Sequence, residues 1–297
     1  MYYIGPIFTI RNRIGVLSEF FVYDLDMYKM IVTDLDETLL NDEKHVSEKD
    51  KEAIDSLKNV RFAVASGRGF VSIQEVLKEI GLYDKENTYS ISLNGAIITE
   101  NKNNRIIHCD YMPYEKAEKI FRIGVGLDTC IHVYTPYMTY VWNLTEEERI
   151  YVNGRIELTP MESDDISFLK NDRIMKILFV NTDMDYLHRL RKELDLEDEY
   201  AITFSANRYL EFNNPGVNKG DGLHKLCEIL DIDISQSIAA GDSLNDREIL
   251  KEAGLSIGVA NAVAQIRDVC DVILESDNNH SPMSEIIDRF IRKEDHY

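Results

Sequence analysis

Short apolar segments alternate along this chain with longer segments in which apolar residues recur at helical spacing. This alternation predicts strands joined by helices. The predicted strands lie at 31–33, 61–65, 89–93, 238–240 and 255–259. Ser47, with Asp50 three residues later, predicts the start of the first helix. Because the strands are apolar along their whole length, we expect an α/β fold with a doubly wound, parallel (Rossmann-like) sheet that is covered on both faces.

The pattern changes in the middle of the chain, where apolar and polar residues alternate and aromatic residues are more frequent. This is typical of a half-exposed antiparallel sheet. The expected helices and strands lie at 114–121, 130–134, 138–142, 175–180 and 184–194. A hairpin is expected just before them, around 101–104. The sequence therefore predicts an inserted α+β domain at 105–205, with the core domain formed by 27–104 and 206–297.

Residues 1–26 precede the first strong strand. Their positive charges follow the apolar stretch, which is the reverse of a secretory signal. We interpret this segment as an N-terminal extension outside the main fold; an ordered arm on the domain surface is the alternative.

Composition narrows the range of partners. The formal net charge of −20 argues against a nucleic-acid partner, and no apolar run has the length of a membrane span. The four cysteines are scattered without a C-x-x-C pair, as is typical of reduced thiols in a cytoplasmic protein. We expect a monomer or weak homo-oligomer. A small anionic substrate stays compatible with the charge, because a bound cation reverses the field locally.

Two acidic clusters carry the strongest chemical signal. Asp34 and Asp36 end the first apolar strand, and Asp242 and Asp246 follow the strand at 238–240. The ends of parallel strands meet at one sheet edge, so these carboxylates can hold a hard cation such as Mg²⁺. A carboxylate is a known nucleophile toward phosphoryl groups, and a second one can handle the proton. Thr38 offers a hydroxyl nearby.

Further polar residues sit at positions suited to an anionic substrate. Ser66 follows the second strand, and Gly67 permits close approach of the backbone. Lys219 lies at a predicted helix start, where its ammonium can bind both Asp34 and a phosphoryl group. Asn245 is expected to orient ligands and water. Each motif alone is common; their order at the strand ends of one sheet is what indicates a site.

With these motifs in place, the chain from about Met27 onward resembles the haloacid dehalogenase-like hydrolases, in the Cof-type branch with an α/β (class IIB) cap. The matching segments are Asp34–Leu40, Ser66–Arg68, Asn94–Ala96, Gly216–Gly220 and Gly241–Asp246. The resemblance implies that 105–205 is a cap that selects the substrate. It also implies a set of roles: Asp34 as nucleophile, Asp36 as general acid/base, Asp242 and the main-chain carbonyl of Asp36 as Mg²⁺ ligands beside Asp34, Asp246 behind them, and Thr38, Ser66, Gly67, Arg68, Asn94, Lys219 and Asn245 at the phosphate.

Two departures from the family pattern stand out. Glu37 occupies a position where glycine is more usual, so its side chain must point away from the phosphate. The loop Asn278–Pro282 replaces a glycine-containing acidic turn. A change in substrate preference and a neutral loop change are both compatible with that difference. The cap aromatics Tyr134, Tyr137, Tyr140 and Trp142 are expected to pack on strands, with a substrate pocket as the alternative.

The sequence therefore predicts a Mg²⁺-dependent phosphatase acting on small phosphorylated metabolites through an aspartyl-phosphate. A phosphotransferase or mutase acting on sugar phosphates, and a non-catalytic phospholigand-binding protein, are the alternatives.

Overall fold

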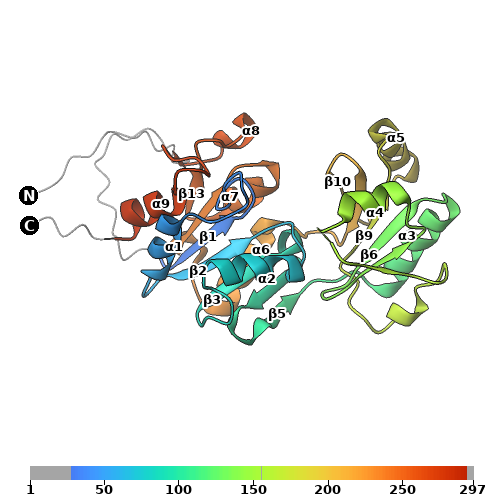
Figure 1. Cartoon of the computed structure of the whole chain (residues 1–297), viewed down its shortest axis with the longest axis horizontal. Helices are drawn as coiled ribbons and strands as arrows, with labels where there is room; N and C mark the ends of the chain where they lie inside the picture. The colour runs from blue at the N-terminus through green and yellow to red at the C-terminus, as the bar shows by residue number, and fades with distance from the viewer. Residues whose placement is uncertain (1–27, 155, 293–297) are drawn as a thin grey trace, which may run out of the picture.

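A computed structural model describes residues 28–154 and 156–292 (Figure 1). The extension predicted at 1–26 lies outside the described residues. Two bodies are visible in Figure 1: the blue–cyan and orange–red segments form one, and the green to yellow segments form the other. Each body is built around its own sheet. Among the described residues, no helix is both long and apolar enough to cross a bilayer.

The first sheet has eight strands in the order β14-β13-β12-β1-β2-β3-β4-β5. Their bounds are β14 Val272–Ile273, β13 Leu255–Gly258, β12 Ser237–Gly241, β1 Met30–Asp34, β2 Arg61–Ala65, β3 Thr88–Ser92, β4 Ile97–Glu100 and β5 Arg105–Cys109. Pairing is parallel from β14 to β3 and antiparallel for the β3–β4 and β4–β5 pairs. All five residues of β1, β3 and β12 are buried, so the sheet is covered on both faces. The predicted doubly wound α/β core is confirmed.

The helices that follow Ser47 and Asn218 begin where the sequence predicts. Ser47 accepts a hydrogen bond from the N–H of Asp50 and so caps the first helix. The helices are α1 Glu48–Asp55, α2 Phe70–Glu79, α6 Lys219–Leu230, α7 Arg247–Glu252, α8 Ala264–Arg267 and α9 Pro282–Phe290. Together with the sheet they bury the larger apolar core, which includes Ile31, Val64 and Leu223.

The second sheet has six strands in the order β10-β11-β9-β6-β7-β8. Their bounds are β10 Ala201–Ser205, β11 Tyr209–Asn213, β9 Lys176–Val180, β6 Cys130–Tyr134, β7 Thr139–Trp142 and β8 Leu158–Pro160. The helices are α3 Tyr114–Gly126, α4 Glu146–Val152 and α5 Met184–Leu194. One apolar cluster joins side chains of α3 and α5 to the sheet, including Phe121, Leu187 and Phe179.

Strand pairing differs from the expected domain limits. β5 lies within 105–205 but pairs with β4 in the first sheet, and β11 lies beyond 205 but pairs with β9 in the second. The chain therefore crosses between the sheets after Cys109 and after Asn213, a few residues later than the predicted 105 and 206. Periodicity alone does not reveal these points, because an antiparallel strand has the same alternation of residues in either sheet.

Three of the four cap aromatics pack against buried apolar clusters, and Tyr134 lies against the cluster that includes Val141 and Leu178. Tyr140 and Trp142 lie against the second body's core, where their rings meet Phe168 and Phe121. Tyr137 differs, since it is 60% exposed and its ring meets Phe70 of α2 with centroids 5.7 Å apart. This contact joins the two bodies.

Candidate active site

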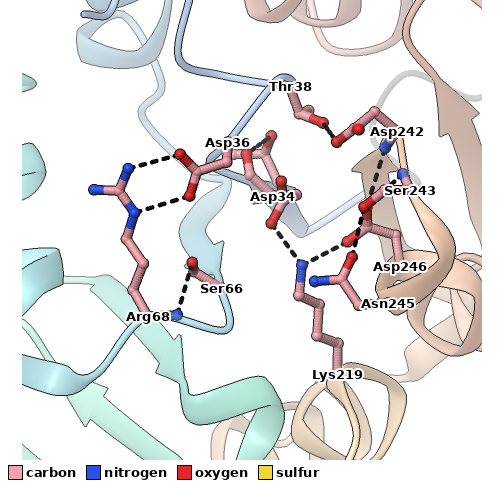
Figure 2. Close-up of polar contacts among 11 residues, drawn as sticks. Asp34, Asp36, Thr38, Ser66, Arg68, Lys219, Asp242, Ser243, Asn245 and Asp246 are labelled. Carbon is pink, nitrogen blue, oxygen red and sulfur yellow. Dashed lines mark hydrogen bonds and ion pairs between the residues drawn. The ribbon is translucent and has the colours of Figure 1, made fainter. Parts of the chain in front are cut away.

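Three neighbouring strands of the first sheet end at one point. β1 ends with Asp34, β2 is followed by Ser66, and β12 is followed by Asp242. Because β12, β1 and β2 are adjacent and parallel, their carboxyl ends lie together, and all three side chains are buried there. Figure 2 shows the residues that converge on this edge, where ligands bind in open α/β sheets.

Lys219 is brought to the same point by the first turn of α6. The side chain of Asn218 caps this helix by accepting from the N–H of Asp221. The Lys219 ammonium donates to Asp34 Oδ1 at 2.5 Å and to Asp246 Oδ1 at 2.6 Å, and the side chain is fully buried (Figure 2). Burial opposes the charged ammonium, yet the two carboxylates outweigh it and raise the pKa of Lys219.

Asp34, Asp242 and Asp246 form a buried acidic cluster in which one carboxylate oxygen of each lies within 4.8 Å of the others. Burial raises the pKa of Asp34 to about 8, against the opposing charge of Lys219 and with Asp246 and Asp242 adding to the rise. Burial also raises the pKa of Asp242 to about 6. A set of oxygen donors with too little local positive charge fits a hard divalent cation such as Mg²⁺.

The members of this cluster are held by local hydrogen bonds. Asp246 Oδ2 accepts from the N–H groups of Asp242 and Ser243, both at 3.0 Å. Thr38 Oγ1 donates to Asp242 Oδ1 at 2.8 Å, which ties the first acidic motif to the second. Asp246 thus faces Lys219 with one oxygen and orders the loop with the other (Figure 2).

Asp36 lies beside Asp34 but in a different environment. Arg68 holds its carboxylate with two hydrogen bonds, Nε to Oδ2 at 2.8 Å and Nη2 to Oδ1 at 2.7 Å. Lys44 lies 3.5 Å from Oδ1. Burial alone would raise the pKa of Asp36, but the hydrogen bonds and charge of Arg68, with Lys44, leave it lowered. The pKa values of the two carboxylates are therefore shifted in opposite directions.

Arg68 was expected at the phosphate, and in this structure its guanidinium binds Asp36 instead (Figure 2). An arginine fork fits a carboxylate and a phosphate equally well, so sequence position does not decide between them.

The loop after β2 packs tightly against neighbouring segments. The N–H of Asn94 donates to the carbonyl of Ser66 at 3.0 Å, and Ser66 Oγ accepts from the N–H of Arg68 at 3.1 Å. Gly95 has φ +111°, and a Cβ there would lie 2.2 Å from the carbonyl oxygen of Asn218. Only glycine permits this approach, which fixes the Asn94 turn against the start of α6.

Two predicted residues on these loops have smaller local roles. Gly67 lies against the Asn94 side chain. Asn245 is exposed, and its Oδ1 accepts from Ser243 Oγ at 2.7 Å. Neither contacts Asp34 through a hydrogen bond that the structure records.

The sequence analysis missed Lys44 and Asn261. Asn261 Nδ2 donates to the carbonyl of Glu37 at 2.7 Å. It follows β13 closely, so a polar residue just past a strand end was the available signal. Lys44 carries no such signal, since a lysine in a polar loop is most often exposed to solvent.

Known proteins that resemble this chain belong to one family of hydrolases. The model of the family described as haloacid dehalogenase-like hydrolase matches residues 31–286. The chain is 28% identical to the 5-amino-6-(5-phospho-D-ribitylamino)uracil phosphatase YcsE of Bacillus subtilis (strain 168), over 85% of this chain and 92% of that protein. It is 27% identical to the HMP-PP phosphatase of Escherichia fergusonii, over 81% and 87%. The crystal structure of TM0651 from Thermotoga maritima superposes with a TM-score of 0.80 at 28% identity, covering 90% of this chain and 98% of that one.

Proposed function

The chain belongs to the haloacid dehalogenase-like hydrolase family. We propose that it is a Mg²⁺-dependent phosphatase of small phosphomonoesters and that it works through an aspartyl-phosphate. It is a phosphatase-type hydrolase, as its relatives are. The observation that carries the proposal is the buried Asp34 carboxylate, bound to the buried Lys219 within a cluster of three carboxylates at the sheet edge.

The reaction proceeds in two displacements. Because Arg68 and Lys44 lower the pKa of Asp36, this carboxylate has to take up a proton from solvent before the first displacement. In that displacement an Asp34 oxygen attacks phosphorus, the ester P–O bond breaks, and Asp36 gives its proton to the departing oxygen. In the second, Asp36 takes a proton from water, the water oxygen attacks phosphorus, and the bond to Asp34 breaks to release inorganic phosphate. Both carboxylates return to their starting states.

A cation is required because a carboxylate attacks an anionic group. Asp34, Asp242 and the main-chain carbonyl of Asp36 would hold Mg²⁺, which when bound shields the phosphoryl oxygens. Lys219 opposes the rise that burial gives to the pKa of Asp34, and it presents positive charge to the phosphate. Thr38, Ser66, Gly67, Asn94 and Asn245 complete the proposed phosphate contacts. To act on substrate, Asp36 has to exchange one Arg68 hydrogen bond for the leaving oxygen.

The substrate class follows from the relatives. Their names specify phosphorylated ribitylaminouracil and HMP-PP, which are small phosphorylated metabolites. We propose that this chain acts on the same broad class, sugar phosphates or phosphorylated cofactors. The four cysteines are free thiols, which fits a reducing compartment, and we place the enzyme in the cytoplasm.

The test is chemical trapping of Asp34. A panel of phosphorylated metabolites is screened with Mg²⁺ and with EDTA to find a substrate. Borohydride is then added during turnover, which reduces an acyl phosphate to an alcohol, so mass spectrometry should find homoserine at position 34. Asp36→Asn should increase the trapped fraction, because hydrolysis of the intermediate is slowed.

The matched variant Asp34→Asn should lose more than about a thousand-fold in turnover and show no trapping while keeping its far-UV circular dichroism. Turnover unaffected by EDTA, or by Asp34→Asn, would overturn the proposal. Transfer of the phosphoryl group to a sugar hydroxyl, with no inorganic phosphate released, would instead identify a phosphotransferase.

A further inference from the structure

Glu37 stands at the apex of the loop that carries the catalytic aspartates, and its backbone has φ +61°. This left-handed region is unfavourable for a residue with a side chain. The loop closes through the N–H of Leu40, which donates to the carbonyl of Leu35 at 2.7 Å. The chain has to turn at Glu37 for this closure, so the strained conformation requires support from elsewhere.

The support comes from Asn261, in the segment after β13. Asn261 Nδ2 donates to the carbonyl oxygen of Glu37 at 2.7 Å, and Asn261 Oδ1 accepts from the N–H of Asn278 at 3.0 Å. The carbonyl of Glu37 can only accept a hydrogen bond, and the N–H of Asn278 can only donate one. The orientation of the amide is therefore set by the network, since the reverse orientation would face oxygen to oxygen.

Asn278 extends the same support. Its buried Nδ2 donates to the carbonyl of Leu40 at 3.2 Å and to Asp42 Oδ1 at 3.0 Å. The loop 278–282, which departs from the family pattern, is therefore hydrogen-bonded to the C-terminal part of the catalytic loop, at Leu40 and Asp42. The two asparagines hold the loop at Glu37 and at Leu40.

The hydrogen bond from Asn261 fixes the orientation of the peptide between Glu37 and Thr38, next to the acidic cluster. In the peptide that joins Glu37 to Thr38, the carbonyl accepts from Asn261 Nδ2 and the N–H donates to the carbonyl of Leu35 at 3.4 Å. The orientation of this plane sets the direction of Thr38, whose hydroxyl donates to Asp242 at 2.8 Å. It also sets the backbone that follows Asp36.

We propose that Asn261 is a positioning residue of the active site, which stabilises the left-handed turn at Glu37 and thereby aligns Asp36 and Thr38 with Asp242. This inference rests on the proposed phosphatase function. Asn261 reaches the reacting atoms only through the backbone, and its side chain is exposed, so its removal should leave the fold intact.

Four variants separate the contacts. Asn261→Ala removes both hydrogen bonds. Asn261→Asp keeps the acceptor for Asn278 and loses the donor to Glu37. Glu37→Gly removes the left-handed penalty, so in that background the loss of Asn261 should matter less. Asn143→Ala is the matched control, because the exposed Asn143 amide also donates to a backbone carbonyl, that of Asp128 at 3.0 Å, in the second body.

The first measurement is hydrogen–deuterium exchange of a peptide covering residues 35–42, which needs no substrate. Asn261→Ala and Asn261→Asp should exchange faster there than the wild type, and Asn143→Ala should not. Exchange unchanged in both Asn261 variants would overturn the proposal. A wild type without phosphatase activity would contradict the proposed function, while this exchange result would still decide whether the turn is held.

The second measurement is hydrolysis of p-nitrophenyl phosphate with Mg²⁺. We expect Asn261→Ala to lower kcat by about three- to ten-fold, the range for one net hydrogen bond, with a smaller change in KM. In the Glu37→Gly background the same substitution should cost clearly less. An equal kcat loss in both backgrounds would overturn the role assigned to the turn.

Discussion

Lys219 is the residue on which the charge balance of the site depends. Its ammonium is the cation hydrogen-bonded to both Asp34 and Asp246, and all three side chains are buried. A buried carboxylate without a partner is costly, because desolvation is no longer offset by attraction. The lysine therefore stabilises the folded state in addition to the role proposed for it in the chemistry.

We expect Lys219→Met to lower the free energy of unfolding by roughly 3 kcal/mol in metal-free buffer, since it leaves two buried carboxylates unpaired. Turnover should be lost as well. Lys225→Met is the control on the same helix, because Lys225 pairs with Glu228 at the surface, and a surface pair contributes less than about 1 kcal/mol. Urea unfolding of both variants makes the comparison, and equal stability would contradict this account of Lys219.

At the residue scale, sequence predicted the positions of the acidic groups better than their partners. Asp34, Ser66 and Asp242 are at strand ends, and parallel strands bring such ends together. The partner of Arg68 depends on a side-chain conformation, and a carboxylate and a phosphate attract the same guanidinium. Asn261 donates to a backbone carbonyl, and the sequence marks it just as a polar residue shortly after the end of β13.

At the scale of single elements, the sheet of the second body contains a buried ion pair. Lys176 on β9 donates to Glu211 on β11 at 2.7 Å, and both side chains are at most 10% exposed. Ser205 on β10 also donates to Glu211. Burial alone would raise the pKa of Glu211, but Lys176 and Ser205 outweigh it and leave it lowered. This pair ties together three strands of the sheet.

A lowered folded pKa fixes the direction of the pH effect. The stabilisation from Glu211 is complete above its unfolded value of 4.5 and is lost as the pH falls below that value. We expect Glu211→Gln to cost roughly 3 kcal/mol at pH 7, with the difference from wild type shrinking towards pH 4. Glu199 is half-buried and pairs with Lys119 in the same body, so Glu199→Gln is the control. A difference that grows on acidification would contradict the sign.

Many of the helices and strands could be predicted from the sequence, but several short ones could not. The strands 61–65 and 130–134 and the helix 184–194 were predicted with the bounds that the structure shows, because their apolar spacing is unambiguous. The helices α4, α8 and α9 and the strands β8, β10 and β14 were missed. They are short or weakly apolar, and their positions depend on pairing with distant strands, which one sequence does not encode locally.

For the whole molecule, net charge and local charge have different consequences. The chain carries −20 overall, so any added salt screens its repulsion and stabilises the folded state to some extent. Added salt has little effect on the acidic cluster at the sheet edge, because the cluster is buried and salt screens buried charges weakly. A specific cation effect has to be measured against this background.

We expect MgCl₂ to raise the unfolding temperature of the EDTA-treated protein beyond the rise given by NaCl at equal ionic strength. Binding to the folded state alone adds about 2.7 kcal/mol when free Mg²⁺ is a hundred times its Kd. Asp242→Asn should abolish this extra rise while keeping an oxygen that can accept from Thr38 Oγ1. Asp55→Asn makes the same change in net charge at an exposed pair with Lys85 and should respond to Mg²⁺ as the wild type does. If NaCl reproduces the whole effect, or if both variants respond alike, Mg²⁺ acts on the overall charge and the cluster at Asp34, Asp242 and Asp246 does not bind it.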